Sequence, residues 1–275
     1  MNEIAQLDET GSRRGGLLMA LLIIALLGVA AFANMWKSDL KVASIAVEGN
    51  SIVGEKEILT LAGVTEATRL FDVDLFAIRK RIEQNNFIRS ASVNREVPNR
   101  ITIRVEERVP IAAVVLDKVL YLDADGYVLP PVRSENIFDL PVLTGTLQRG
   151  ELTPGKQCPA ANVRDALGVL KVAQQVSDEL YRRISEVHVE GEKDIILYTA
   201  EFGVPVIFGR GDTPAKMVKL HSFWKEFVNH HGAQELQYVD LRYQDQVVVR
   251  WVHDKRELIN APLRTAGLVP MVQNH

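Results

Sequence analysis

A single uncharged run constrains this chain more than any other feature of its sequence. The run Gly15–Trp36, between Arg14 and Lys37, contains no Asp, Glu, Lys or Arg. Crossing the hydrocarbon core of a bilayer takes roughly 20 mostly apolar helical residues, and this run is long enough. We therefore expect residues 15–36 to form a transmembrane helix, with residues 1–14 as a short cytoplasmic tail.

The same run also has features of a cleavable leader. Arg13 and Arg14 form a positive n-region, and Ala31-Phe32-Ala33 fits an A-x-A cleavage pattern. The apolar stretch of a leader covers only about 7–15 residues, however. Trp36 stands at the far boundary, where an indole is favoured at the headgroup level. The sequence favours an uncleaved anchor and leaves the leader open.

Composition limits what the rest of the chain can do. Hydrophobic residues make up 47% and charged residues 24%, which is typical of a globular protein. The net charge of −3 argues against a nucleic-acid binder, which would show a basic excess. The one cysteine, Cys158, excludes an internal disulfide and a cysteine-based zinc site.

Residues 40–109 predict a small domain in the order strand, helix, helix, strand, strand. Apolar alternation indicates the strands, and apolar spacing of three and four indicates the helices. We expect a three-stranded sheet covered on one face by two helices. The expected elements are a strand at 42–47, a helix from Ser51 to the stop signal Gly63, a helix capped by Asp72 or Asp74, and strands at 88–96 and 101–105.

Residues 110–252 predict a second, mainly antiparallel β domain with two helices, so the fold class is α+β. Residues 131–158 hold few regular signals, and residues 253–275 read as a tail. The expected elements are strands at 114–116, 119–122, 127–129, 184–189, 194–199, 204–208, 238–243 and 247–251, and helices at 162–180 and 213–231. In the second helix Met217, Leu220, Trp224, Phe227 and Val228 are expected to face inward.

The sequence contains none of the common catalytic or nucleotide-binding motifs. The histidines His221, His230 and His231 do not lie four apart on one helix face, so we expect no metal and no cofactor. A tethered chain without catalytic residues is typical of proteins that bind partners. An exported enzyme with an unfamiliar site is not excluded by sequence.

The last two strands are the candidate binding site. Tyr243 is expected to share a strand face with Val239 and Leu241, and Val247, Val249 and Trp251 share a face of the next strand. Strands that come last often lie at a sheet edge, whose unpaired N–H and C=O groups accept an added strand. On the pattern alone, ordinary packing remains the somewhat favoured interpretation of Tyr243 and Trp251.

Several stretches, in their order and spacing, resemble the FtsQ/DivIB family of bacterial cell-division proteins. The element order at 42–108 is similar to that of a POTRA domain. The stretches that carry the resemblance are Ile45-Ala46-Val47-Glu48-Gly49-Asn50, Pro98 to Ile103, Glu107 to Ala112, Leu122 to Gly126, Gly209 to Thr213, and Tyr238 to Tyr243 with Trp251.

The resemblance implies a non-enzymatic divisome adaptor, anchored in the inner membrane with its bulk in the periplasm. It implies that the last strands receive FtsB, in complex with FtsL, by strand addition, with Tyr243, Val247, Val249 and Trp251 at the contact. It implies septal recruitment through FtsK, and FtsW, FtsI and FtsN as further division partners. The alternative from another class is a POTRA-bearing component of protein transport or outer-membrane assembly.

Overall fold

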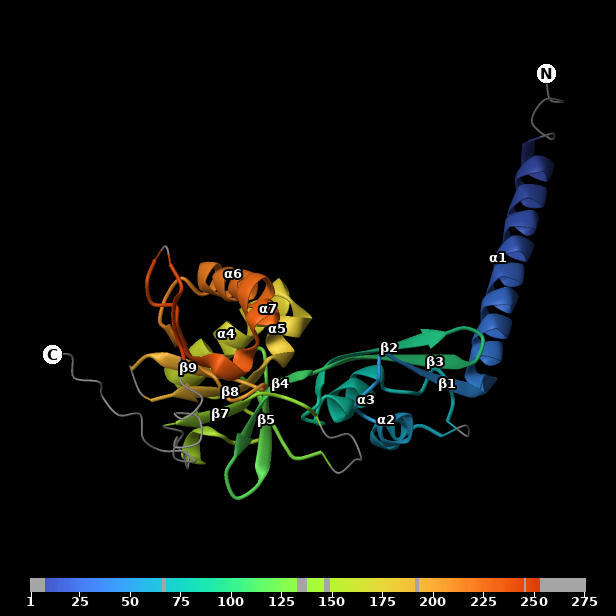
Figure 1. Ribbon diagram of the computed structural model, residues 1–275. Coiled ribbons are helices and arrows are strands. Elements are labelled where there is room, and N and C mark those ends of the chain that lie inside the picture. The colour runs from blue at the N-terminus through green and yellow to red at the C-terminus, as the bar shows by residue number, and fades with distance from the viewer. Residues whose placement is uncertain are drawn as a thin grey trace. The chain divides into compact units, whose positions relative to one another are not determined.

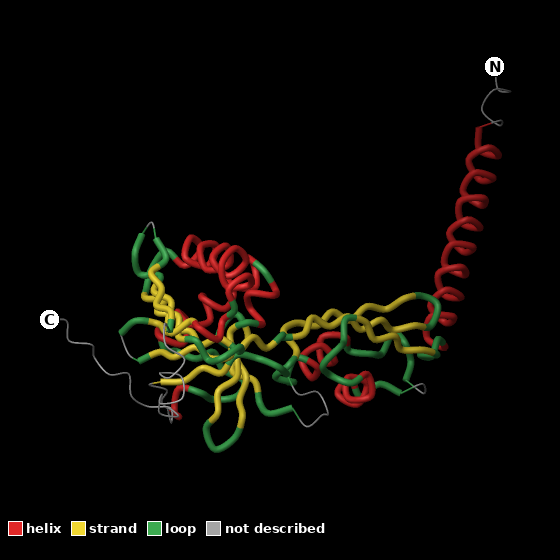
Figure 2. The backbone as a smooth tube through the Cα atoms, viewed as in Figure 1, coloured by secondary structure: helices red, strands yellow, loops and turns green. Residues whose placement is uncertain are grey.

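The structure is a computed structural model that describes residues 8–65, 68–132, 138–145, 149–190, 193–244 and 246–252. The chain divides into two compact units, one up to Arg108 and the other from Val109 (Figure 1). Each unit has its own sheet and helices (Figure 2). The two units are described separately below.

The first element is the long helix α1, Asp8–Asp39, which contains the uncharged run (Figure 1). Its described apolar side chains are exposed along the helix, as at Leu22, Leu26 and Phe32, the last 73% accessible. A search of the described residues finds no helix with the length and apolar character needed to span a membrane.

The sheet of the first unit has the order β1-β3-β2, formed by β1 Ser44–Glu48, β2 Ile88–Glu96 and β3 Arg100–Glu107. β1 pairs with β3 in parallel, and β2 pairs with β3 as an antiparallel hairpin. Helices α2 Glu55–Ala62 and α3 Leu75–Ile82 contribute the buried Ile58, Ile78 and Ile82 to the core of this unit, and β3 contributes the buried Ile101 and Ile103. The predicted element order is confirmed.

Local signals explain where the two short helices begin and end. The Asp74 side chain accepts a hydrogen bond from the Ala77 amide and caps α3, as predicted. Gly63, with φ of 63°, ends α2 in the left-handed conformation that glycine adopts without strain. The predicted start of α2 at Ser51 is wrong by one turn. The amides of residues 51–53 bind the Glu107 carboxylate instead, at 2.7–2.9 Å, and α2 begins at Glu55.

The second unit is built on a mixed sheet in the order β12-β11-β10-β9-β8-β7-β4-β5-β6. Five of its eight neighbouring pairs are antiparallel and three are parallel, the latter being β4 with β7, β7 with β8, and β10 with β11. Its strands are β4 Pro110–Val115, β5 Val119–Asp123, β6 Val128–Leu129, β7 Val142–Gly145, β8 Ile184–Val189, β9 Ile195–Thr199, β10 Pro205–Gly209, β11 Leu236–Asp240 and β12 Val248–Trp251.

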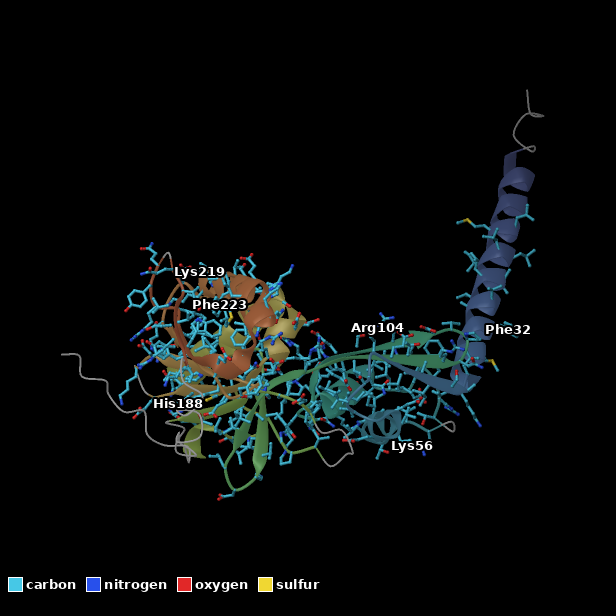
Figure 3. All side chains as sticks on the ribbon, viewed as in Figure 1. Phe32, Lys56, Arg104, His188, Lys219 and Phe223 are labelled. Carbon is cyan, nitrogen blue, oxygen red and sulfur yellow. The ribbon has the colours of Figure 1, made fainter. Side chains whose placement is uncertain are left out.

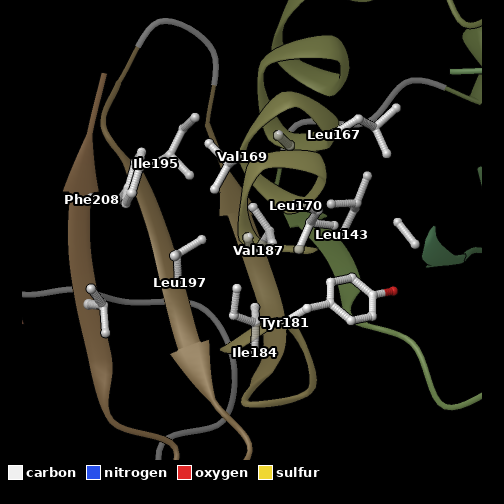
Figure 4. Close-up of a cluster of buried hydrophobic side chains, with 14 of the residues drawn as sticks. Leu143, Leu167, Val169, Leu170, Tyr181, Ile184, Val187, Ile195, Leu197 and Phe208 are labelled. Atoms are coloured by element: carbon white, nitrogen blue, oxygen red, sulfur yellow. The ribbon is translucent and has the colours of Figure 1, made fainter. Parts of the chain in front are cut away.

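Helices cover one face of this sheet and form the core with it. Figure 4 shows Leu167 and Leu170 of α4 against Leu143, Val187 and Leu197 of the strands. The helical segments are η1 Arg149–Glu151, α4 Ala161–Val176, α5 Asp178–Arg182, α6 Thr213–Phe223, the π-helical turn η2 Trp224–Val228, α7 Asn229–His231 and η3 Ala233–Glu235.

Two predictions about these helices are wrong. The expected helix at 162–180 is interrupted at Ser177, whose side chain accepts hydrogen bonds from the amides of Glu179 and Leu180 and so starts α5. Phe227, expected inward, is 50% exposed. It lies in the π-helical turn, whose extra residue rotates the following side chains relative to an α-helix.

Candidate partner-binding edge

The strand β12 lies at one end of the sheet of the second unit, where it pairs with β11 alone among the described strands. The pairing is antiparallel, with Val239 opposite Val249 and Asp240 opposite Val248. A strand in this position presents one row of backbone N–H and C=O groups to its neighbour and the alternate row to the outside.

One hydrogen bond and the strand register identify which row faces outward. The Leu241 amide donates to the Ile207 carbonyl at 2.9 Å, so the odd-numbered residues of β11 bond toward β10 and the even-numbered residues toward β12. The partners of the even-numbered residues are Val248 and Arg250. Backbone alternation then directs the N–H and C=O groups of Val249 away from β11.

The apolar side chains near this edge are only partly buried. Val247, Val249 and Trp251 are half-buried and pack on the core of the second unit, as the shared face predicts. Arg250, between them, points to the solvent side. A strand laid along β12 would cover the remaining apolar area of this row.

Tyr243 does not lie where the sequence placed it. β11 ends at Asp240, and Tyr243 lies beyond the strand, 48% exposed, rather than on one strand face with the buried Val239 and Leu241. The Asp240 carboxylate accepts a hydrogen bond from the Arg242 amide two residues on, and this local turn ends the strand. Val247 immediately precedes β12, whereas Val249 and Trp251 belong to it.

A buried carboxylate organises the end of β11. Burial by itself raises the pKa of the Asp240 carboxyl, but hydrogen bonds from Arg242 and the positive charges of Arg242 and Lys216 outweigh it and hold the pKa below its ordinary value. The Arg242 guanidinium lies 2.7 Å from Asp240 and 3.0 Å from Asp194. Its hydrogen bond to Asp240 in turn raises the pKa of Arg242.

A second cation holds the segment that follows. Lys219 of α6, labelled in Figure 3, donates from Nζ to the carbonyl oxygens of Tyr243 at 2.9 Å and Gln244 at 2.7 Å. Sequence reasoning missed both Lys219 and the Asp240–Arg242 pair. The i, i+2 spacing of Asp240 and Arg242 carried a signal for the local turn, whereas nothing near Lys219 in sequence indicated its distant partners.

The described residues were searched for a metal site and for a reactive cysteine. They contain no cluster of three or more histidine, cysteine or acidic side chains that could hold a metal ion. Burial raises the pKa of the Cys158 thiol, and the side chain is enclosed in the core, which is typical of an inert cysteine.

Comparison with known proteins identifies the family. A curated relative, "Cell division protein FtsQ" of Syntrophotalea carbinolica, is 33% identical over 242 residues, which span 86% of this chain and 85% of the relative. The chain belongs to the FtsQ/DivIB cell-division family. Two further relatives named "Cell division protein FtsQ" support this assignment. The protein from Rhodothermus marinus is 30% identical over 88% of this chain and 89% of its own length, and that from Geobacter sp. strain M21 is 30% identical over 78% and 77%.

Two family models cover most of the globular part. Residues 40–108 match "POTRA domain, FtsQ-type", and residues 113–242 match "Cell division protein FtsQ/DivIB, C-terminal". The family consists of non-enzymatic divisome components that act at the division septum. Neither match points to a transport component. The second match ends at residue 242, so it does not extend over Tyr243 or β12.

Proposed function

We propose that this FtsQ-family chain is a divisome adaptor whose β12 edge receives a strand of FtsB, held in complex with FtsL. The outer side of β12, where no described strand pairs with it, carries the proposal. Its outward N–H and C=O groups and half-buried apolar side chains are what strand addition uses. Val247, Val249 and Trp251 supply the strand face, and Tyr243 supplies an exposed aromatic ring beside it.

A proline at Val249 tests this proposal at the level of single hydrogen bonds. Proline is tolerated in an edge strand where the lost N–H faces outward. Val249→Pro should therefore keep β12 paired with β11 yet prevent FtsB–FtsL binding, whereas the matched Val249→Ala, which keeps the N–H, should bind with less than a tenfold loss. Tyr243→Glu should also weaken binding, through loss of the aromatic contact.

The assay is binding of purified FtsB–FtsL periplasmic segments to the full-length chain, with folding checked by hydrogen exchange across β8, β9 and β10. Normal affinity in a folded Val249→Pro variant would refute strand addition at this edge. If Val249→Pro loses exchange protection throughout the sheet, that variant is misfolded. Binding of FtsB–FtsL to the Tyr243→Glu variant then tests the proposal.

We further propose that residues 15–36 are an uncleaved inner-membrane anchor, with residues 1–14 cytoplasmic and the POTRA domain (40–109), the β domain (110–252) and the tail (253–275) periplasmic. The uncharged sequence and the exposed apolar side chains of α1 support this. Anchoring beside membrane-held partners would raise their effective concentration. Contacts with FtsK, FtsW, FtsI and FtsN belong to the same proposal. Intact mass of the membrane-fraction protein tests the anchor, and a mature chain that begins at Asn34 would overturn it.

A further inference from the structure

We propose that Lys219 is a positioning residue for the β12 edge. Its ammonium group fixes the path of residues 242–244 and thereby holds β12 ready for a partner strand. This inference rests on the proposed function, and it adds a residue of α6 that is not itself part of the edge.

The contact that carries the inference joins one ammonium group to two consecutive carbonyl oxygens. Lys219 Nζ donates to Tyr243 at 2.9 Å and to Gln244 at 2.7 Å, across more than 20 residues of sequence. Consecutive carbonyls along a chain converge on one cation only when the backbone between them turns. The ammonium group therefore selects one backbone conformation of this segment from the many that are open to an exposed loop.

Little else among the described residues holds the segment. The side chains of Arg242, Tyr243 and Gln244 are exposed, so apolar packing does not fix them. Leu241 before them is buried, and Val247 after them is half-buried. Apart from Lys219, the described contacts of the segment are the ion pairs of Arg242 with Asp240 and Asp194 and the hydrogen bond from the Arg242 amide to Asp240. All of them hold only its first residue.

The consequence differs from an ordinary loss of stability. Without Lys219 the two carbonyls at the surface can bind water, so the fold loses little. The segment then samples other conformations, and only a fraction of molecules presents β12 correctly. Apparent affinity falls by that fraction, and so does the association rate, whereas the dissociation rate of the formed complex stays the same.

The first arm of the test measures hydrogen exchange of the full-length chain. In Lys219→Met, amides in peptides that cover residues 241–249 should exchange several-fold faster than in the wild type, while β8–β10 stay unchanged. Lys219→Arg, which keeps the charge and donors, should restore much of the protection. Lys225→Met, a nearby exposed lysine without these contacts, is the matched control. Unchanged exchange in Lys219→Met would overturn the inference.

The second arm measures binding kinetics with purified FtsB–FtsL segments as the probe. Lys219→Met should lower the association rate about 3–10-fold and leave the dissociation rate unchanged. The lower association rate of Lys219→Met should persist at about 0.5 M salt, where electrostatic steering is screened. A faster dissociation rate, or a deficit that disappears in salt, would mean direct contact or steering and would overturn the positioning role.

The two arms keep this inference separate from the proposed function. If wild-type protein fails to bind FtsB–FtsL, strand addition at β12 is refuted. The exchange result still decides whether Lys219 orders residues 242–244, since it needs no partner.

Discussion

The carboxylate of Glu107 makes the strongest quantitative prediction for the POTRA domain. It stands at the end of β3 and accepts hydrogen bonds from the amides of Ser51, Ile52 and Val53 at 2.9, 2.7 and 2.8 Å. These three amides precede α2 and have no helical partner, so the carboxylate closes the loop between β1 and α2 onto the sheet.

The cost of removing it follows from those contacts. A hydrogen bond to a charged group contributes roughly 1.5–3 kcal/mol net. Ser51 is exposed and its amide can bind water, whereas Ile52 and Val53 are more enclosed. We therefore expect Glu107→Ala to destabilise this domain by about 2–4 kcal/mol, less than the sum of three full bonds.

Glu107→Gln removes the negative charge of the side chain and keeps its shape. Glutamine keeps one oxygen acceptor, but its NH2 group replaces the other oxygen and faces amides that also donate. The loss should therefore be nearly as large as for alanine, about 2–3 kcal/mol. Glu106→Gln, on the exposed side of the same strand, should change stability by less than about 0.5 kcal/mol.

The assay is urea unfolding followed by hydrogen exchange of peptides within residues 40–108, since the two units need not unfold together. Exchange at residues 51–53 should accelerate in both Glu107 variants before the sheet is affected. A Glu107→Gln variant as stable as the wild type would refute the reasoning.

Three other predictions concern the β domain. Gly145→Ala should cost about 2–4 kcal/mol in urea unfolding, because φ is 104° and a Cβ would lie 1.9 Å from a β8 carbonyl oxygen; Gly150→Ala, which meets nothing within 4 Å, should be nearly neutral. Asp240→Asn should destabilise at pH 7, and its difference from wild type should shrink below about pH 4. The pKa of Asp240 is depressed in the fold, so the stabilisation is complete above the unfolded pKa and is lost as pH falls through the folded one. Tyr181→Phe should cost about 1–1.5 kcal/mol, because its hydroxyl donates to a buried β4 carbonyl at 2.9 Å. Burial, with Asp139 as a lesser cause, raises the pKa of Tyr181 to about 12. Its contribution should therefore fade as pH rises from about 10 toward that value, and ultraviolet titration should show one late-ionising tyrosine missing in the variant.

The POTRA domain could be predicted closely because its signals are local. Asp74 and Gly63 mark helix ends through their own side-chain and backbone chemistry, and β2 alternates from Ala91 onward. The start of α2 was predicted wrongly because it depends on a distant residue. The partner that satisfies the amides after Asn50 is Glu107, more than 50 residues away, and no local pattern encodes it.

The β domain shows the same limit. β7 was missed because Val142–Gly145 is too short to alternate, and it becomes a strand through its parallel neighbours β4 and β8. At the candidate site, the apolar row of Val247, Val249 and Trp251 was visible in sequence. The displacement of Tyr243 was not, because it depends on where Asp240 and Arg242 end β11.

The place of β12 in the sheet determines when the proposed docking edge can form during synthesis. Synthesis proceeds from the N-terminus, and β12 is the last described strand along the chain and lies at one end of the sheet. The proposed docking edge therefore exists only once every other described strand of the sheet has been made. A chain interrupted before Val248 would expose β11 instead, with Asp240 and Arg242 at its end. Recruitment through β12 would thus select finished molecules and give the division machinery a built-in check on the completeness of its own component.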